Sequence, residues 1–236
     1  MKKRRVSLIL ILAAAIFLLA GCTPKAMNPE AFSQVFVNRL IYGGDEDKFK
    51  EAYRDADNFI EEMDGDVMFL EEIVTDSFES AGADITDAQS KSITDSLLNA
   101  VRTKTSYEVK NIQEGDNGSV TVTYAIKGLD FPILMKDWLN AFIVQLQANP
   151  SLMTDEDQMT SLGMQLFDTS MKNIQARTEA VEVSLDFDLD RGKWYVPEDQ
   201  QDNAESLIFA FFFGARDEDA FEAEINQIMG EVMASL

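Results

Sequence analysis

The chain has 236 residues, of which 46% are hydrophobic, and a formal net charge of −22. This excess of negative charge argues against nucleic-acid binding and against flat docking on an anionic membrane, because both surfaces would repel the protein. The chain has no histidine and a single cysteine, Cys22, so it lacks the commonest general base, the commonest transition-metal ligand and any internal disulfide. Serine–histidine–aspartate and cysteine–histidine catalysis are therefore excluded.

The first 22 residues have the features of an exported, lipidated protein. Residues 2–5 are all cationic, and residues 6–20 form an apolar run that is shorter than the roughly 20 residues needed to span a bilayer. The next motif, which resembles the lipobox of bacterial lipoproteins, consists of Leu19, Ala20, Gly21 and Cys22. We therefore expect a signal peptide over residues 1–21 and a lipid such as palmitate on Cys22, with an uncleaved signal anchor as the alternative.

Cleavage before Cys22 would leave 215 residues with a net charge of −26, because residues 1–21 contain four cations and no acid. Residues 22–29 predict a short linker that keeps the domain close to the membrane. We expect residues 30–236 to form one domain on the extracytoplasmic face of the cell membrane. The sequence has neither a P-loop nor a glycine-rich dinucleotide fingerprint, so we expect no cofactor.

Apolar residues at helical spacing predict helices through the first third of this domain. Thr86 and Gln89 have the spacing of a capping box, which marks the start of one of them. The expected helices cover residues 30–41, 47–64, 66–78 and 86–101.

Alternating apolar and polar residues then predict a β-hairpin. Asn117–Gly118 lies between the two alternating runs and is the dipeptide best suited to a tight turn. Folding across this turn places Val109 opposite Ile126 on one face. The same register places Glu108 opposite Lys127 on the other face.

Two further helices, a second hairpin and two closing helices complete the predicted order. The helices between the hairpins are expected over residues 132–147 and 155–177, and the closing helices over residues 204–213 and 217–236. Arg191–Gly192 forms the second predicted turn. The pairs expected across it are Leu189 with Trp194, Phe187 with Val196, and Asp190 with Lys193.

Clusters of acidic residues are the candidates for cation binding. Acidic tripeptides at residues 45–47, 155–157 and 217–219 each precede an apolar helix, so we expect them to cap helix amides and oppose the helix dipole. A second group, which resembles the start of a calcium loop, consists of Asp186, Asp188 and Asp190. Arg191 and Pro197 stand where that loop needs glycine and glutamate, so we predict the solvated face of a strand and no metal site.

The apolar run Leu207–Phe213 has two interpretations. An exposed run of this kind would form a patch that binds a partner. A helix without an amphipathic period is more typical of an element that is buried on most of its sides. The sequence therefore favours a core helix here and leaves the patch as the alternative.

The order of elements predicts an α+β domain, with helices packed on an antiparallel sheet of about four strands. The lipobox at Cys22, the helical start, the late strand Gly192–Tyr195 and a closing helix that ends at Gly214 resemble uncharacterised lipoproteins of Gram-positive bacteria. That resemblance implies a cystatin-like cone of the nuclear-transport-factor type, in which a curved sheet wraps a long helix. The two helices between the hairpins would be an insertion, and the resemblance assigns no catalytic residue.

Three functions remain open. The first is a non-enzymatic surface lipoprotein that binds a peptide, a small molecule or a protein partner in the concavity of its sheet. The second is a carboxylate-based enzyme that acts on cell-wall glycan, and the third is a surface protein that binds divalent cations. The missing catalytic residue types favour the first.

Overall fold

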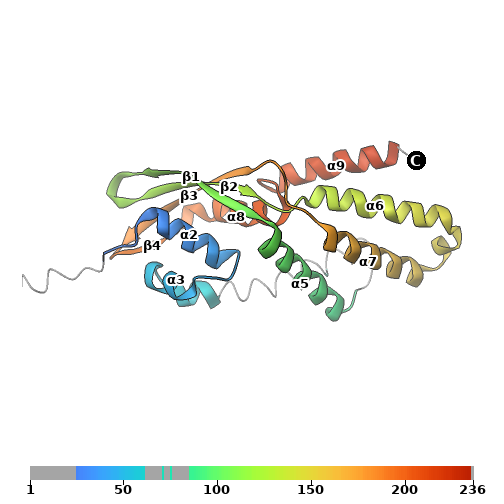
Figure 1. Ribbon diagram of the computed structural model, residues 1–236, viewed down its shortest axis with the longest axis horizontal. Helices are drawn as coiled ribbons and strands as arrows, with labels where there is room; N and C mark the ends of the chain where they lie inside the picture. Colours follow the sequence, from blue (N-terminus) through green and yellow to red (C-terminus); the bar gives the residue numbers. More distant parts are fainter. Residues whose placement is uncertain (1–24, 62–70, 72–74, 76–84, 235–236) are drawn as a thin grey trace, which may run out of the picture.

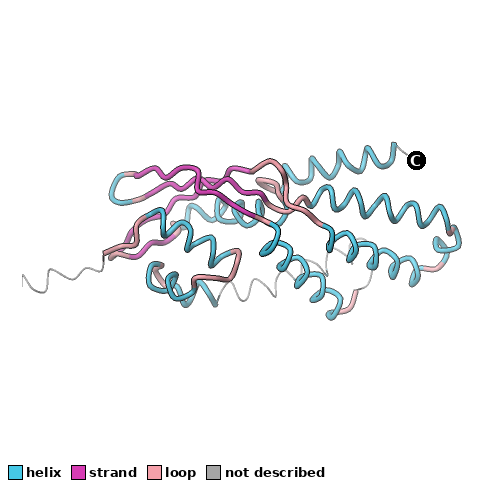
Figure 2. The backbone as a smooth tube through the Cα atoms, viewed as in Figure 1, coloured by secondary structure: helices cyan, strands magenta, loops and turns pink. Residues whose placement is uncertain are grey.

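The structure, a computed structural model, describes residues 25–61, 71, 75 and 85–234 (Figure 1). The expected signal peptide and the lipobox with Cys22 lie outside the described residues, and so does the helix expected over residues 66–78 except for its residues 71 and 75, which are helical. Within the described part, helices pack on a four-stranded antiparallel sheet (Figure 2), which confirms the predicted α+β class.

The sheet has the strand order β1-β2-β3-β4. Its strands are β1 (Ser106–Glu114), β2 (Val120–Lys127), β3 (Val181–Asp190) and β4 (Lys193–Tyr195). One face is apolar and fully buried at Val122, Tyr124 and Leu185. The other face is polar, with an ion pair between Lys110 and Glu182. This division into a buried and a solvated face is typical of antiparallel sheets.

Two helices pack on the sheet, α2 (Pro29–Leu40) and α8 (Gln201–Phe213). Helix α8 contacts β2 and β3, and α2 contacts the sheet through aromatic side chains. Phe32 and Phe36 of α2 meet the ring of Phe187 edge-on, with centroid distances of 5.1 and 4.9 Å. Such edge-on pairs add to the stabilisation from burial. We define the aromatic cluster as Phe32, Phe36, Phe49, Tyr53, Phe187 and Trp194, all of which are buried.

The prediction of one continuous helix over residues 47–64 is wrong, because the helix is interrupted. Helix α3 (Glu46–Ala52) ends before Tyr53, whose backbone is extended, and residues 56–61 are helical again. The backbone N–H of Arg54 donates to the carbonyl of Trp194 at 2.8 Å, and Tyr53 pairs with Trp194 in a parallel bridge. The chain leaves the helix because this segment caps the edge of β4 while the Tyr53 ring enters the aromatic cluster.

The register predicted for the first hairpin is also wrong. Tyr107, rather than Val109, lies opposite Ile126, and a bulge interrupts the ladder between Val109 and Asn111. The turn is a short 3-10 segment, η1 (Asp116–Gly118), instead of a two-residue turn. The longer turn and the bulge together shift the pairing by two residues, so the apolar side chains stay on the predicted face.

The second hairpin follows the prediction more closely. Leu189 pairs with Trp194 and Asp190 with Lys193, and both turn residues have positive φ (50° at Arg191 and 83° at Gly192). The expected pair of Phe187 with Val196 is wrong because β4 ends at Tyr195. The backbone N–H of Val196 is instead 3.5 Å from the hydroxyl of Tyr53.

The remaining helices are α5 (Asp87–Lys104), α6 (Phe131–Ala148), α7 (Glu156–Asn173) and α9 (Glu218–Ala234). The capping box of Thr86 and Gln89 is confirmed at the start of α5. Helices α6 and α7 connect β2 to β3 and project beyond the end of the sheet, with α9 along the other side of α6 (Figure 1). We call α6, α7 and α9 the arm.

The burial of a tyrosine predicts a titration at high pH. The Tyr107 hydroxyl donates to Asn38 Oδ1 at 3.1 Å, and burial raises the pKa of this phenol to about 12. Because the unfolded phenol ionises near pH 10, the stability from neutral Tyr107 is complete below about pH 10 and is lost as the pH rises towards 12. Absorbance at 295 nm should show phenols that titrate at high pH, because burial also raises the pKa of Tyr42 and of Tyr124. Tyr107→Phe should lower the change in absorbance near pH 12 by the amount of one phenol. An unchanged absorbance step in Tyr107→Phe would contradict the assignment.

Alanine substitutions at two glycines should change the free energy of unfolding in opposite directions. A Cβ added at Gly128 would lie 1.8 Å from the carbonyl oxygen of Ala210, whereas one added at Gly230 meets nothing within 4 Å. We expect Gly128→Ala to lower the free energy of unfolding by about 3 kcal/mol, because β2 and α8 must separate. The control Gly230→Ala, in the interior of α9, should raise it by about 0.5–1 kcal/mol. Urea unfolding measures both, and equal effects would contradict the packing described.

Candidate functional site at the root of the arm

The arm is attached to the sheet by a short backbone ladder. The N–H of Leu129 donates to the carbonyl of Phe211 at 3.0 Å, which ties the end of β2 to α8. On the other side, the N–H of Arg177 donates to the carbonyl of Gly128 at 2.8 Å, and that of Asp130 to the carbonyl of Gln175 at 2.9 Å. These bonds end α7 at Asn173, so the helix expected to continue to residue 177 is shorter than predicted.

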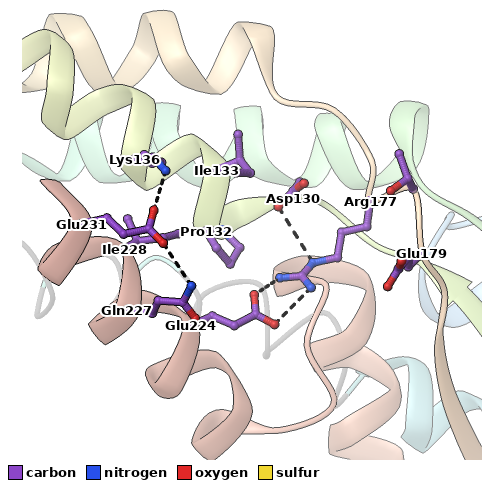
Figure 3. A pocket seen from close by; sticks show the side chains of 11 residues that line it. Asp130, Pro132, Ile133, Lys136, Arg177, Glu179, Glu224, Gln227, Ile228 and Glu231 are labelled. Carbon is purple, nitrogen blue, oxygen red and sulfur yellow. Dashed lines mark hydrogen bonds and ion pairs between the residues drawn. The ribbon is translucent and has the colours of Figure 1, made fainter.

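A cleft of about 380 Å³ opens beside this ladder, between the start of α6, the segment after α7, and α9 (Figure 3). Both polar and apolar side chains line it. They are Asp130, Pro132, Ile133, Lys136, Arg177, Thr178, Glu179, Glu224, Gln227, Ile228 and Glu231.

Arg177 is the central charge of the cleft. Its two terminal nitrogens donate to the two carboxylate oxygens of Glu224, and its Nε lies 3.9 Å from Asp130 Oδ1 (Figure 3). Only 19% of the Arg177 side chain is exposed. A bidentate ion pair of this kind fixes the orientation of both side chains. Arg177 therefore joins three elements: the segment after α7, the start of α6, and α9.

A second ion pair lies further along the cleft. Lys136 Nζ is 2.7 Å from Glu231 Oε2, and the Gln227 amide donates to Glu231 Oε1 at 3.0 Å. The hydrogen bond from Lys136 is the main cause that holds the pKa of Glu231 below its usual value. A general acid needs a raised carboxyl pKa, so Glu231 is shifted in the direction opposite to that role.

Aromatic rings fill the base of the arm. Phe213 lies 5.3 Å from Phe131 and 5.2 Å from Phe221 between ring centroids, so α8, α6 and α9 share one apolar contact. Four of the seven residues in the run Leu207–Phe213 are buried, and Ile208 is 36% exposed. The prediction of a helix buried on most sides is confirmed.

Two of the three acidic tripeptides cap helices as predicted. The Asp155 carboxylate accepts from the N–H of Gln158 at 3.0 Å, and that of Asp217 from the N–H of Ala220 at 2.9 Å. Asp45 is the exception, because it has φ = 53° and makes no capping bond. Its carboxylate accepts instead from Asn38 and Lys48, and the bond from Lys48 is the main cause that lowers its pKa.

The alternate aspartates of β3 each have a neighbour of their own. Asp186 accepts from Thr121 Oγ1 at 2.6 Å, Asp188 from the Tyr195 hydroxyl at 3.3 Å, and Asp190 lies 3.8 Å from an Arg54 nitrogen. They alternate with the buried residues of the strand and so lie on its polar face. Within residues 25–61, 71, 75 and 85–234, no group of acidic side chains has an arrangement suited to a metal ion.

The expected binding site in the concavity of the sheet is occupied by the protein itself. Phe32 and Phe36 of α2 and Phe187 of β3 are at most 1% exposed, so side chains fill this space. The cleft lies at the root of the arm instead. Sequence reasoning singled out none of its charged residues, although Arg177 is the lone basic residue between Lys172 and Arg191 in an acidic stretch.

Residues 19–212 match the model of a protein family described as a domain of unknown function, DUF5105. The chain belongs to the DUF5105 family. The DUF5105 match begins at the lipobox residue Leu19 and ends before α9. A search of curated proteins gave no match.

Among solved structures, the DUF5105 chain is similar to YcdA of Bacillus subtilis, a candidate lipoprotein, with a TM-score of 0.53 and 15% sequence identity. The likeness covers 77% of this chain and 55% of YcdA, so the chain matches about half the length of that protein. At this identity, the likeness concerns the fold alone.

The geometry around Arg177 predicts a measurable coupling energy. Removing either member of a partly buried, two-pronged pair leaves its partner less well solvated, so Arg177→Met and Glu224→Gln should each cost about 1–2 kcal/mol. A double-mutant cycle measured by urea unfolding should give a coupling of about 1 kcal/mol. Lys110 and Glu182, each more than half exposed, form the matched control, for which we expect less than about 0.5 kcal/mol. Equal coupling in both pairs would show that Arg177 does not hold the arm.

Proposed function

We propose that this DUF5105 protein is a lipoprotein, held at the extracytoplasmic face of the cell membrane by a lipid on Cys22, whose domain binds a partner. The observation that carries the proposal is the lipobox at residues 19–22 behind a cationic and apolar leader, which the family match includes from Leu19 onwards. The fold likeness to YcdA, a candidate lipoprotein, supports it. A search of the described helices found none long and apolar enough to cross a membrane.

Binding is favoured over catalysis by the chemistry of the cleft. Arg177, Lys136 and their carboxylate partners pair with one another, so their charges hold helices together. The low pKa of Glu231 is unsuited to protonating a glycosidic oxygen. A carboxylate enzyme that acts on wall glycan remains the second candidate, and turnover abolished by a single Asp→Ala or Glu→Ala change would establish it.

We also propose that the sheet with α2 corresponds to the cystatin-like core, and that α6 and α7 are an insertion into it. The position of α2 against the buried side of a four-stranded antiparallel sheet supports this proposal. The described chain begins at the end of the molecule opposite the arm (Figure 1). An anchor at Cys22 would therefore leave the tip of the arm as the part farthest from the point of attachment.

Cys22→Ser tests the anchor directly. The variant should lose labelling by radioactive palmitate, because the protein has no other thiol. The control Ala20→Ser keeps a small residue in the lipobox and should remain labelled. If Cys22→Ser still takes up palmitate, or if the unchanged chain takes up none, the lipoprotein proposal fails.

A further inference from the structure

Helix α6 is far more apolar than its burial explains. Of its 18 residues, only Pro132 and Leu134 are buried. Five large apolar side chains are exposed in the described part of the chain, and four of them lie on α6 and α9. These four are Ile133 (47%), Val144 (59%), Met229 (41%) and Met233 (64%). Two of them, Met229 and Met233, are four residues apart and so share one side of α9, and exposed apolar side chains that gather on a highly charged protein mark a candidate interaction site.

The cause is the arrangement of the arm as a single layer. Helix α6 lies between α7 and α9, and among the described helices and strands none covers the broad faces of its outer part (Figure 1). Four apolar residues of α6 repeat at intervals of four, three and four, the spacing of a seam that packs against another helix. They are Met135, Leu139, Phe142 and Leu146, and each is partly exposed.

Helix α9 carries a parallel stripe. Ile225, Met229 and Met233 recur every four residues, so they share one side of the helix. Gln227, on the cleft side, is two residues from Met229, which at about 100° per residue places them on opposite sides of α9. The same reasoning places Met135 opposite the cleft residue Ile133 on α6. The two stripes therefore lie on the side of the arm opposite Ile133 and Gln227.

Charge selects among the occupants of this surface. Helices α6, α7 and α9 together hold nine acidic and two basic side chains. Both bases are already paired, Lys136 with Glu231 and Lys172 with Asp168. A second copy of the chain would bring the same excess of negative charge and would be repelled. An anionic membrane would repel the arm for the same reason. A cationic partner is the one that this charge attracts.

We propose that the seam formed by Met135, Leu139, Phe142 and Leu146 on α6, with Met229 and Met233 on α9, binds a cationic amphipathic helix of a partner. The helix lies along α6 and converts the single layer into a bundle, with its apolar side on the seam and its basic residues towards the acids of the arm. Methionines suit such a surface because their flexible side chains adapt to different partners. The inference deepens the proposed function, on whose claim of partner binding it rests.

The test uses the full lipidated chain in phosphatidylcholine nanodiscs, with empty nanodiscs as the reference. The probe is a fluorescent 18-residue helix built of leucine and lysine, with its leucines at four-three-four spacing, and its affinity is followed by anisotropy. The double variant Met229→Ser/Met233→Ser should weaken binding about tenfold. The matched control Val144→Ser/Ile208→Ser removes two exposed apolar residues that line neither the seam nor the cleft, and it should leave the affinity unchanged.

A second peptide, with glutamate in place of every lysine, should not bind. Equal loss in both double variants, equal binding of both peptides, or binding no greater than to empty nanodiscs would each overturn the inference. Self-association of the chain that Met229→Ser/Met233→Ser abolishes would assign the seam to a second copy and would overturn it as well. Loss of palmitate labelling in Cys22→Ser is independent of these results, so the lipoprotein proposal can stand where this inference fails.

Discussion

The close approach of two backbones at the end of β2 organises the molecule. Gly128 passes so near the carbonyl of Ala210 that even a methyl group would collide with it. This contact brings β2 against α8, lets Leu129 bond to Phe211, and sends the chain out of the sheet into α6. Arg177 then closes the junction by pairing with Glu224 of α9, whose Phe221 also packs against Phe213. The direction of the arm thus follows from one residue that has no side chain.

Local pattern predicts most elements of this fold but not their register. Helices α2, α5, α6, α8 and α9 and all four strands occur where apolar periodicity places them, because each buries one face. The pairing of β1 with β2 was missed because Asn117–Gly118 predicts a tighter turn than the one formed. The bulge had a signal in the sequence: Ile112 follows Val109 by three residues instead of two, so a regular strand would place them on opposite faces.

The site was harder to predict because its members are distant along the chain. Arg177 and Glu224 are separated by 47 residues, and nothing near either one indicates the partner. The break of the helix at Tyr53 was hard to predict for the same reason. The apolar residues around Tyr53 have helical spacing, and only its pairing with Trp194 at the edge of β4 explains why the helix ends there. Chemistry that depends on composition, such as the absence of histidine, was in contrast visible at once.

The two edges of the sheet are closed to further strands in different ways. At β4, the N–H of Arg54 donates to the carbonyl of Trp194. At β1, the bulge beside the charged Lys110 makes the edge irregular, which disfavours pairing with another strand. Lipid anchors confine proteins to two dimensions, where neighbours of the same kind meet at high local concentration. An open, regular edge would promote strand-to-strand aggregation under such crowding. With the anchor proposed at Cys22, the irregularity of β1 would keep neighbouring copies from pairing edge to edge.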